Sequence, residues 1–311
     1  MNNSSQHILM VRPASFGFNE DTAADNEFQE TNFDLSNTEY IESALKEFDH
    51  YVATLRANNI DVTVIDDTPE PRKPDSQFPN NWFTTHRDGN IFLYPMRPIN
   101  RRLERRSDII DMMEMCFHVS KVTDLSIYEE QNKFLEGTGS IIFDRVHKIA
   151  YACVSGRTDQ ELFEKHAETL GYEPVVFTSL DENDVPIYHT NVMLSIATDF
   201  VVICGASVKN AEEKALLWEK FKSTGKEIID VSFSQLRDFT CNVLEVTDLN
   251  GNKKITMSSR AFHSFTPEQI EVMEKYVDII HSPIDTIENV CGGGTRCMMA
   301  EIYLDENIHI S

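Results

Sequence analysis

Short apolar runs that begin at a polar residue and end at a turn recur along the chain, and they predict β-strands. The run 81–85 is followed by a turn at 88–90 and by a second run at 91–94, which is typical of a hairpin. Apolar residues at helical spacing over 101–116 and a third run at 119–125 follow. The pattern therefore predicts a ββαβ unit in this part of the chain.

The same order of elements recurs in the rest of the sequence. The second unit has strands at 139–143, 149–154 and 174–178, with a helix that begins at Thr158-Asp159 and stops at Gly171. The third has strands at 190–197, 200–204 and 227–231 and a helix at 209–222. The fourth has strands at 240–247, 254–257 and 277–281, and its helix begins at Thr266-Pro267.

The fifth unit is divided between the two ends of the chain. We expect a strand at 297–304 to pair with a strand at 8–12, followed by a helix at 37–57 and a strand at 60–65. Five such units predict an α/β fold in which small sheets repeat around a centre, as in a five-bladed α/β propeller. We expect residues 1–311 to form one catalytic domain of this kind, with the proline-rich stretch 66–77 as a loop at its rim.

A polar residue without an obvious turn role stands where the first strand of each unit begins. In a radial fold these positions converge, so thiol, imidazole, carboxylate and carboxamide groups would meet in one cavity. Such a set can supply a nucleophile, a general acid/base and hydrogen-bonding partners for a substrate. The residues are Asn80 and Asn81, Glu136, His189 and Asn191, Asn242 and Cys297.

Cys297 follows three glycines, Gly292 to Gly294, at the turn that enters the last strand. Beside Arg296 and loop amides, we expect its thiol to have a lowered pKa. Cys297 also fits a structural role as a small buried hydrophobe, as His189 fits that of a core histidine. Cys291 is a weaker second thiol outside the strand pattern. We expect four other histidines to be structural, namely His50, His86, His118 and His281.

Composition narrows the function. Apolar residues make up 41% and charged residues 25% of the 311 residues, as in a soluble globular protein, and the net charge is −23. Such an acidic surface disfavours nucleic acid and anionic membranes. The sequence shows no signal peptide, membrane span, disulfide scaffold or zinc motif, so we expect a cytoplasmic protein without metal or cofactor. Homo-oligomerisation stays open.

Over nearly its whole length the chain resembles the guanidino-group-modifying superfamily, which contains arginine deiminases, dimethylarginine dimethylaminohydrolases and glycine amidinotransferases. The resemblance implies the five-bladed propeller called the pentein fold. Five motifs carry it, in this order: Phe78-Pro79-Asn80-Asn81-Trp82, Glu136-Gly137-Thr138-Gly139, Ser155-Gly156-Arg157-Thr158, His189-Thr190-Asn191 and Gly292-Gly293-Gly294-Thr295-Arg296-Cys297.

The resemblance also implies roles for individual residues. Cys297 would be the nucleophile, His189 the general acid/base, and Glu136 a catalytic carboxylate that binds the substrate nitrogens and orients the histidine. Arg157 would bind the substrate carboxylate, and Arg101 would be its second arginine, although Arg102 and Arg97 lie close enough in sequence to compete for that role. Asn80 and Asn242 join the substrate-binding set.

Two departures from the superfamily pattern bear on the substrate. Arginine deiminases have aspartates where this chain has Asn81 and Asn191. A carboxamide offers one donor group and one acceptor and no charge, which suits a neutral ureido group better than a guanidinium. We therefore expect a hydrolase that converts citrulline to ornithine, carbon dioxide and ammonia. The alternatives are an arginine deiminase- or dimethylarginine hydrolase-like enzyme, an amidinotransferase, or a propeller that only binds a partner.

Overall fold

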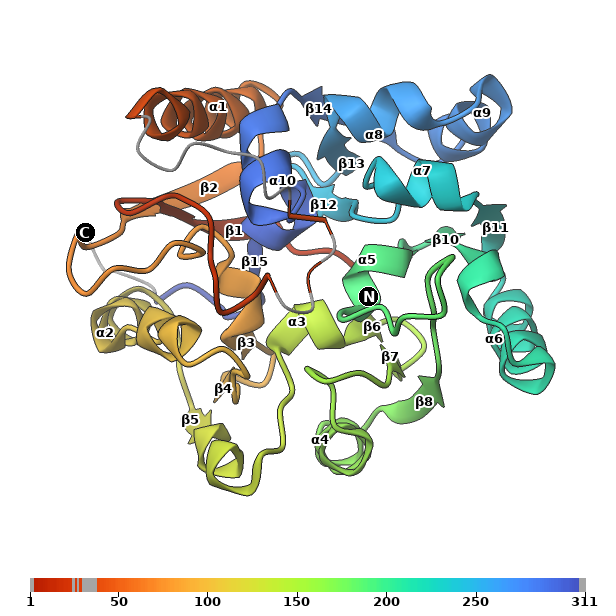
Figure 1. Cartoon of the computed structure of the whole chain (residues 1–311), viewed down its shortest axis with the longest axis horizontal. Helices are drawn as coiled ribbons and strands as arrows, with labels where there is room; N and C mark the ends of the chain where they lie inside the picture. Colours follow the sequence, from red (N-terminus) through yellow and green to blue (C-terminus); the bar gives the residue numbers. More distant parts are fainter. Residues whose placement is uncertain (1–2, 24–25, 27, 30–37, 308–311) are drawn as a thin grey trace.

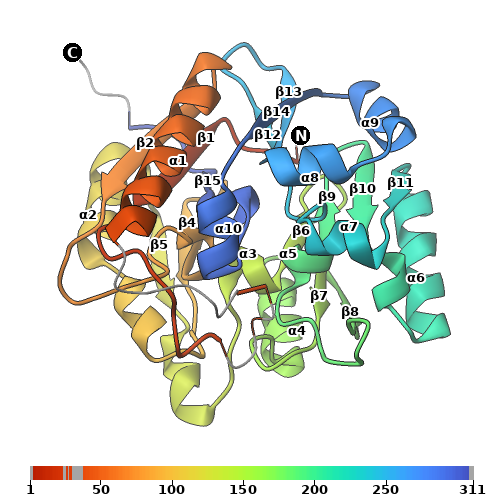
Figure 2. The same ribbon diagram turned by 45° about the horizontal axis from the view of Figure 1, so that its top comes forward.

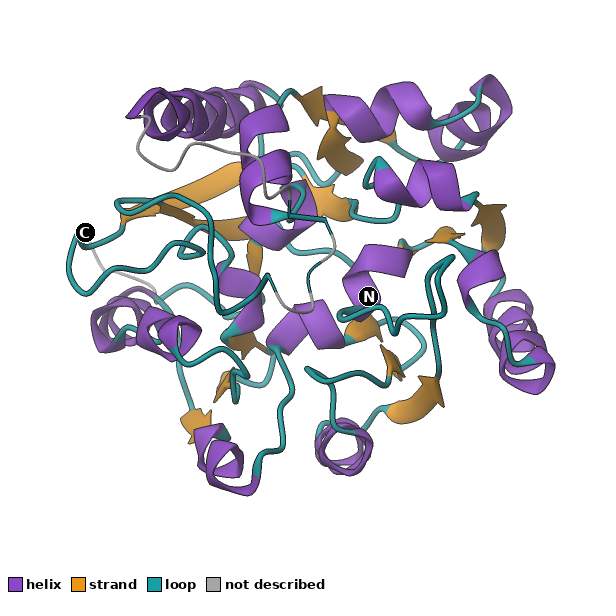
Figure 3. Ribbon diagram, viewed as in Figure 1, coloured by secondary structure: helices purple, strands orange, loops and turns teal. Residues whose placement is uncertain are grey.

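The computed structural model describes residues 3–23, 26, 28–29 and 38–307, which form a mixed α/β fold (Figures 1, 2 and 3). Within this part of the chain the strands form five three-stranded sheets. The first sheet joins the two ends of the chain and consists of β15 (Ala300–Ile302), β1 (His7–Arg12) and β2 (Asp61–Asp66). The second consists of β3 (Phe83–Thr85), β4 (Asn90–Leu93) and β5 (Lys121–Asp124), and the third of β6 (Ile142–Asp144), β7 (Ile149–Cys153) and β8 (Glu173–Phe177). The fourth consists of β9 (Leu194–Ile196), β10 (Phe200–Ile203) and β11 (Glu227–Asp230), and the fifth of β12 (Leu244–Thr247), β13 (Lys253–Ser258) and β14 (Asp278–Ser282).

Each sheet has the same topology. Its middle strand pairs antiparallel with the first strand and parallel with the third. A parallel pair needs a crossover, and a helix supplies it on the outside of the molecule (Figure 1). These outer helices are α1 (Thr38–Ala57), α2 (Ser107–Cys116), α4 (Gln160–Thr169), α6 (Ala211–Ser223), and the pair α8 (Ser259–Ser264) and α9 (Pro267–Glu274). The five predicted ββαβ units are thus present, including the one divided between the chain ends.

The structure shows capping groups at two of the predicted helix starts. Asp159 accepts a hydrogen bond from the backbone N–H of Leu162 at 2.8 Å and caps α4. Thr266 forms a capping box with Gln269, and Pro267 occupies the first turn of α9. Gly171 follows α4 with φ +72°, a conformation that L side chains rarely adopt. The start of α1 was predicted at Asn37, which lies outside the described residues.

The predicted starts of the first strands were wrong. Four of them begin with a helical turn instead, and the strand starts two to four residues after the predicted position. The turns are η1 (Pro79–Asn81), α3 (Gly137–Ser140), α5 (Thr190–Met193) and η5 (Thr295–Met298). In the fourth unit, Asn242 lies in the segment just before β12.

The predicted helix over 101–116 is also divided, into η2 (Asn100–Glu104) and α2. Five further short elements were not predicted: η3 (Ser126–Gln131), η4 (Gly205–Ser207), α7 (Phe233–Arg237), α8 and α10 (Asp285–Cys291). Among the described helices, none combines the length and apolar character needed to cross a bilayer.

Candidate active site

The short turns bring the predicted polar residues together near the middle of the molecule. α3 packs against η1 and α5, and η1 packs against η5. Figure 1 shows α3 and α5 near the centre of the view, inside the ring of outer helices. Glu136 and His189 are the residues immediately before α3 and α5, while Cys297 lies within η5. Residues more than a hundred positions apart in sequence therefore lie at one site.

Glu136 and His189 form a buried pair. His189 Nε2 lies 2.8 Å from Glu136 Oε2, and Glu136 Oε1 accepts a hydrogen bond from the backbone N–H of Arg97 at 2.9 Å. Burial alone raises the pKa of Glu136, but the charges of Arg157, His189 and Arg101 and the hydrogen bond from His189 outweigh it and lower this pKa to about 2. Glu136 is therefore a carboxylate at neutral pH and holds His189 in place.

Burial favours the neutral form of His189. Burial lowers its pKa, and the hydrogen bond and charge of Glu136 only partly oppose that effect. With Nε2–H donating to Glu136, the Nδ1 atom keeps its lone pair and can accept a proton. Nδ1 faces Gly139, where a Cβ atom would lie only 2.8 Å from it. The Gly at this position thus leaves the space that the imidazole occupies.

The sulfur of Cys297 is surrounded by carboxamides. Asn242 Nδ2 donates to it at 3.2 Å and Asn191 Nδ2 at 3.4 Å. Burial raises the thiol pKa, although these hydrogen bonds and the charge of Arg296 act in the other direction. The lowered pKa that the sequence suggested was therefore wrong. As a nucleophile, the Cys297 thiol would first have to lose its proton.

Arg101 fixes the orientation of the Asn81 side chain. Arg101 Nη1 donates to Asn81 Oδ1 at 2.9 Å, and a guanidinium can only donate, so the oxygen of Asn81 must face it. Asn81 Nδ2 then points the other way, close to Gly139. This Nδ2 atom has no hydrogen-bond partner among the described residues, and neither do Asn191 Oδ1 and Asn80 Oδ1. The site thus presents unused donor and acceptor groups of neutral amides.

Both arginines that the resemblance assigns to a substrate carboxylate line this cavity. Arg101 forms a two-pronged pair with Glu104, at 2.8 and 2.9 Å, and lies 3.8 Å from Asp75. Arg157 Nη1 lies 3.6 Å from Glu136, and its guanidinium packs over the ring of Tyr188.

The two competing arginines lie elsewhere. Arg102 donates to the backbone oxygen of Met96 and pairs with Glu129. Arg97 is exposed, and neither residue lines the cavity.

The cavity itself is small, about 20 Å³, which is room for a water molecule or so and not for an amino acid. Thr22 and Asn26 from the N-terminal part of the chain line it, and Asn26 Nδ2 donates to the backbone oxygen of Cys291 at 3.1 Å. Thr22 and Asn26 thus cover this side of the cavity, and we call these two residues the N-terminal cover. The loop 66–77, which we expected at the rim, contributes Asp75.

Several residues of the site were not identified from the sequence. Thr22, Asn26 and Asp75 carry no motif, and only the tertiary contacts reveal them. Tyr188 precedes His189 directly, and Glu104 stands three residues after Arg101, so proximity in sequence was the available signal for these two. Cys291 lines the cavity, but burial raises the pKa of its thiol well above the ordinary value.

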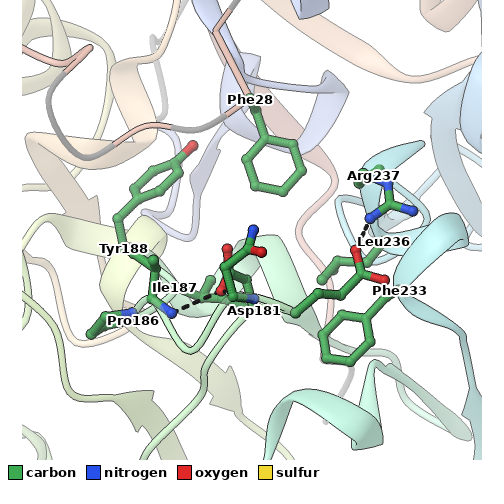
Figure 4. A pocket seen from close by; sticks show the side chains of 11 residues that line it. Phe28, Asp181, Pro186, Ile187, Tyr188, Phe233, Leu236 and Arg237 are labelled. Atoms are coloured by element: carbon green, nitrogen blue, oxygen red, sulfur yellow. Dashed lines mark hydrogen bonds and ion pairs between the residues drawn. The ribbon is translucent and has the colours of Figure 1, made fainter.

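A second cavity of about 140 Å³ lies next to the first, and Tyr188 lines both (Figure 4). Its wall is mainly apolar, with Phe28, Ile187 and Leu236. The Tyr188 hydroxyl donates to the backbone oxygen of Gly292 at 3.1 Å. Tyr188 is therefore the partition between this cavity and the site.

A protein-family model matches nearly the whole chain. The model described as "N,N dimethylarginine dimethylhydrolase, eukaryotic" matches residues 12–304. The chain belongs to this family. It is thereby a member of a family of cysteine-dependent carbon–nitrogen hydrolases in the guanidino-group-modifying superfamily, as its motifs indicated. The comparison with curated proteins gives no match.

Solved structures share the fold. ArgZ, an arginine dihydrolase of the ornithine-ammonia cycle in cyanobacteria, matches with a TM-score of 0.75 and 18% identity over 98% of this chain. The chain spans only 41% of full-length ArgZ, but it spans 99% of the ArgZ N-terminal domain that was solved with its substrate, with a TM-score of 0.74 and 18% identity. The dimethylarginine dimethylaminohydrolase of Pseudomonas aeruginosa, solved as a cysteine-to-serine mutant in complex with citrulline, matches with a TM-score of 0.65 and 16% identity over 96% of this chain and 99% of its own.

Proposed function

We propose that this family member hydrolyses a ureido carbon–nitrogen bond, with citrulline as substrate and ornithine, carbon dioxide and ammonia as products. The observation that carries the proposal is the fixed orientation of Asn81. Its Nδ2 group is a donor without a partner among the described residues, because Arg101 occupies its oxygen at 2.9 Å, and Asn81 lines the cavity. A ureido oxygen can accept from this group, whereas a guanidinium has only N–H groups and would meet a donor with a donor.

The other unused amide atoms suit the same substrate. Asn191 Oδ1 and Asn80 Oδ1 are acceptors without a partner among the described residues, and a ureido group has N–H donors to offer them. A site that is built to hydrogen-bond one polar pattern discriminates strongly against another, by as much as about 10⁴-fold. We infer that the carboxamides, which replace the carboxylates of arginine deiminases, select a neutral substrate.

The geometry and the family support a set of catalytic residues. We propose that the Cys297 thiol gives its proton to the free Nδ1 atom of His189 and that the thiolate attacks the ureido carbon. Glu136 stabilises the imidazolium that forms, as its low pKa allows. Asn81 and Asn242 then stabilise the oxygen of the tetrahedral intermediate.

The second half of the reaction restores the thiol. His189 gives its proton to the departing amine as one carbon–nitrogen bond breaks, which leaves a carbamoyl group on the Cys297 sulfur. His189 next takes a proton from water, and the hydroxide breaks the carbon–sulfur bond. The carbamate released decomposes to carbon dioxide and the second amine. Arg157, with Arg101 as the second arginine, would bind the substrate carboxylate after the cover has moved.

One other substrate has specific support. ArgZ, whose fold this chain shares, is an arginine dihydrolase, so arginine is the competing candidate. A binding module without catalysis is less consistent with membership of a hydrolase family. We further propose that the five sheets close into a propeller around the site and that the protein acts in the cytoplasm on its small-molecule substrate.

A substrate panel tests the proposal. Purified full-length protein is given citrulline, arginine, dimethylarginine and agmatine, and ammonia and ornithine are measured. We expect a higher kcat/KM for citrulline than for the other three, and no turnover by Cys297→Ser. A clear preference for arginine would contradict the argument from Asn81, and full activity of Cys297→Ser would contradict the mechanism.

A further inference from the structure

A second cluster of chemically capable side chains lies at the opposite end of the sheet that joins the chain termini. His7 begins β1, Asp61 begins β2, and Glu306 follows β15. One ligand atom from each lies within 4.8 Å of the other two. Cys297 precedes β15 and Glu306 follows it, so this cluster is separated from the active site by the length of that strand.

His7 and Asp61 lie almost as close together as two ligands of one metal ion. His7 Nδ1 lies 2.8 Å from Asp61 Oδ2, the separation of an ion pair when the imidazole is protonated. With a neutral imidazole whose Nε2–H is directed at Thr63, both atoms carry lone pairs, and a metal ion can take the place of the proton. Ligand atoms of a tetrahedral zinc ion, at bond lengths of about 2.1 Å, lie about 3.4 Å apart, which is close to the separation of this pair.

The other side of the imidazole prepares Nδ1 as a ligand. His7 Nε2 lies 2.9 Å from the hydroxyl oxygen of Thr63, and when Nε2–H donates to that oxygen the lone pair remains on Nδ1. Metal-binding histidines are usually oriented by such a bond from their second nitrogen. The edge of Phe117 packs against the imidazole, with ring centroids 5.1 Å apart, and limits its rotation. Only Glu306, which is exposed, has to adjust its side chain to complete the set.

The cluster lies at the wall of a cavity of about 580 Å³, which the three residues line together with Arg87 and Asp305. We propose that His7, Asp61 and Glu306 bind one divalent transition-metal ion, with zinc the best match to one imidazole and two carboxylates. Three protein ligands leave coordination positions that face the cavity and are free for water or a small anion. The ion links the first strand, the second strand and the C-terminal end of the same sheet.

Zinc binding by the purified full-length protein tests this site. Titration calorimetry with zinc alone should show one saturable site at micromolar zinc, and the melting temperature should rise with zinc. Glu306→Gln should weaken binding at least 10-fold without loss of folding, because its side chain is exposed. His7→Ala should abolish binding. Asp305→Asn is the matched control, since Asp305 is exposed and lines the same cavity outside the cluster.

Cobalt substitution separates this site from the cysteines of the active site. Cobalt bound by one nitrogen and carboxylates gives weak visible bands without the charge-transfer band of a thiolate ligand. The absence of saturable binding, equal affinity of wild type and Glu306→Gln, or loss of binding in Cys297→Ser would each overturn the proposal. These outcomes do not depend on whether citrulline is the substrate.

Discussion

Arg101 donates a 2.9 Å hydrogen bond to the side-chain oxygen of Asn81, and this contact leaves the amide nitrogen of Asn81 beside Gly139 with no partner among the described residues. The same arginine is held by both oxygens of Glu104, so its own position is fixed. The orientation of the Asn81 amide thus depends on a buried pair of Arg101 and Glu104. If the proposed function holds, this hydrogen bond takes part in setting the substrate preference.

Replacement of Asn81 by Asp should change that preference. The carboxylate keeps its contact with Arg101 and therefore folds, but it has no N–H to offer a ureido oxygen. We expect kcat/KM for citrulline to fall about 10- to 100-fold, as for a buried polar group that loses its partner, and the ratio of arginine to citrulline turnover to rise. Steady-state kinetics with both substrates measures this. Asn250→Asp makes the same chemical change in an exposed turn and should leave both rates unchanged.

The raised pKa of the Cys297 thiol predicts slow alkylation of the free enzyme at neutral pH. Since the folded pKa lies above the ordinary value of 9.0, only a small fraction is thiolate at pH 7, and the cover excludes the reagent. The rate of labelling by iodoacetamide should rise as the pH increases above 9, measured by peptide mass spectrometry. Cys116 is exposed and serves as the internal standard in the same sample. Labelling of Cys297 as fast as Cys116 at pH 7 would show that the thiol is open and ionised.

The ionised side chain of Glu136 stabilises the folded protein, and protonation by acid removes this stabilisation. Its folded pKa of about 2 is below the ordinary 4.5, so the carboxylate stabilises the fold fully above pH 4.5 and loses this effect as the pH falls toward 2. This shift of the Glu136 pKa corresponds to about 3 kcal/mol of unfolding free energy. Urea unfolding of wild type and Glu136→Gln should therefore differ most at pH 6 and converge toward pH 2.5.

The same experiment has a matched control in Glu130→Gln, because Glu130 is exposed. That variant should follow wild type at every pH. A gap between wild type and Glu136→Gln that stays constant from pH 6 to pH 2.5 would mean that Glu136 is not ionised in the folded protein.

Much of the architecture was predictable because it is local. The caps at Asp159 and Thr266 and the order of strands and helices are visible in spacing alone. The helical turns that hold the catalytic residues were missed because three or four residues are too few to show a period of 3.6. The segment 190–197, for example, is apolar both where α5 forms and where β9 forms, so the sequence does not show the boundary between them.

What the sequence could not predict depends on distant contacts. Asn26 covers the site through a bond to Cys291, 265 positions away, and no motif marks either partner. The predicted pKa of the Cys297 thiol was wrong for the same reason. The neighbour Arg296, whose charge lowers this pKa, is visible in the sequence, but the burial that raises it by more is not. Candidate site residues were predicted where a motif coincided with a unit boundary, and other residues that line the cavity were missed where only packing brings them in.

Glu104→Gln tests whether the buried ion pair positions Asn81. Burial raises the pKa of Glu104 to about 8, but the two-pronged contact with Arg101 favours its carboxylate form. Glutamine offers Arg101 one acceptor oxygen instead of two and removes that carboxylate, so the guanidinium is free to shift toward Asp75, 3.8 Å away. Asn81 then loses its fixed orientation. We expect kcat/KM for citrulline to fall about 10-fold, and we expect the preference for citrulline over arginine to narrow, because the Asn81 amide can then rotate.

Glu129→Gln provides the control, because Glu129 holds Arg105 in a similar two-pronged pair, at 2.6 and 3.2 Å, outside the cavity. Loss of either pair can lower the melting temperature, but only the Glu104 variant should change the substrate ratio. If both variants lose stability and keep the wild-type ratio of citrulline to arginine turnover, Glu104 has a structural role alone. Restoration of the ratio by Glu104→Asp, which retains the charge, would instead show that the ion pair sets the preference through Arg101 and Asn81.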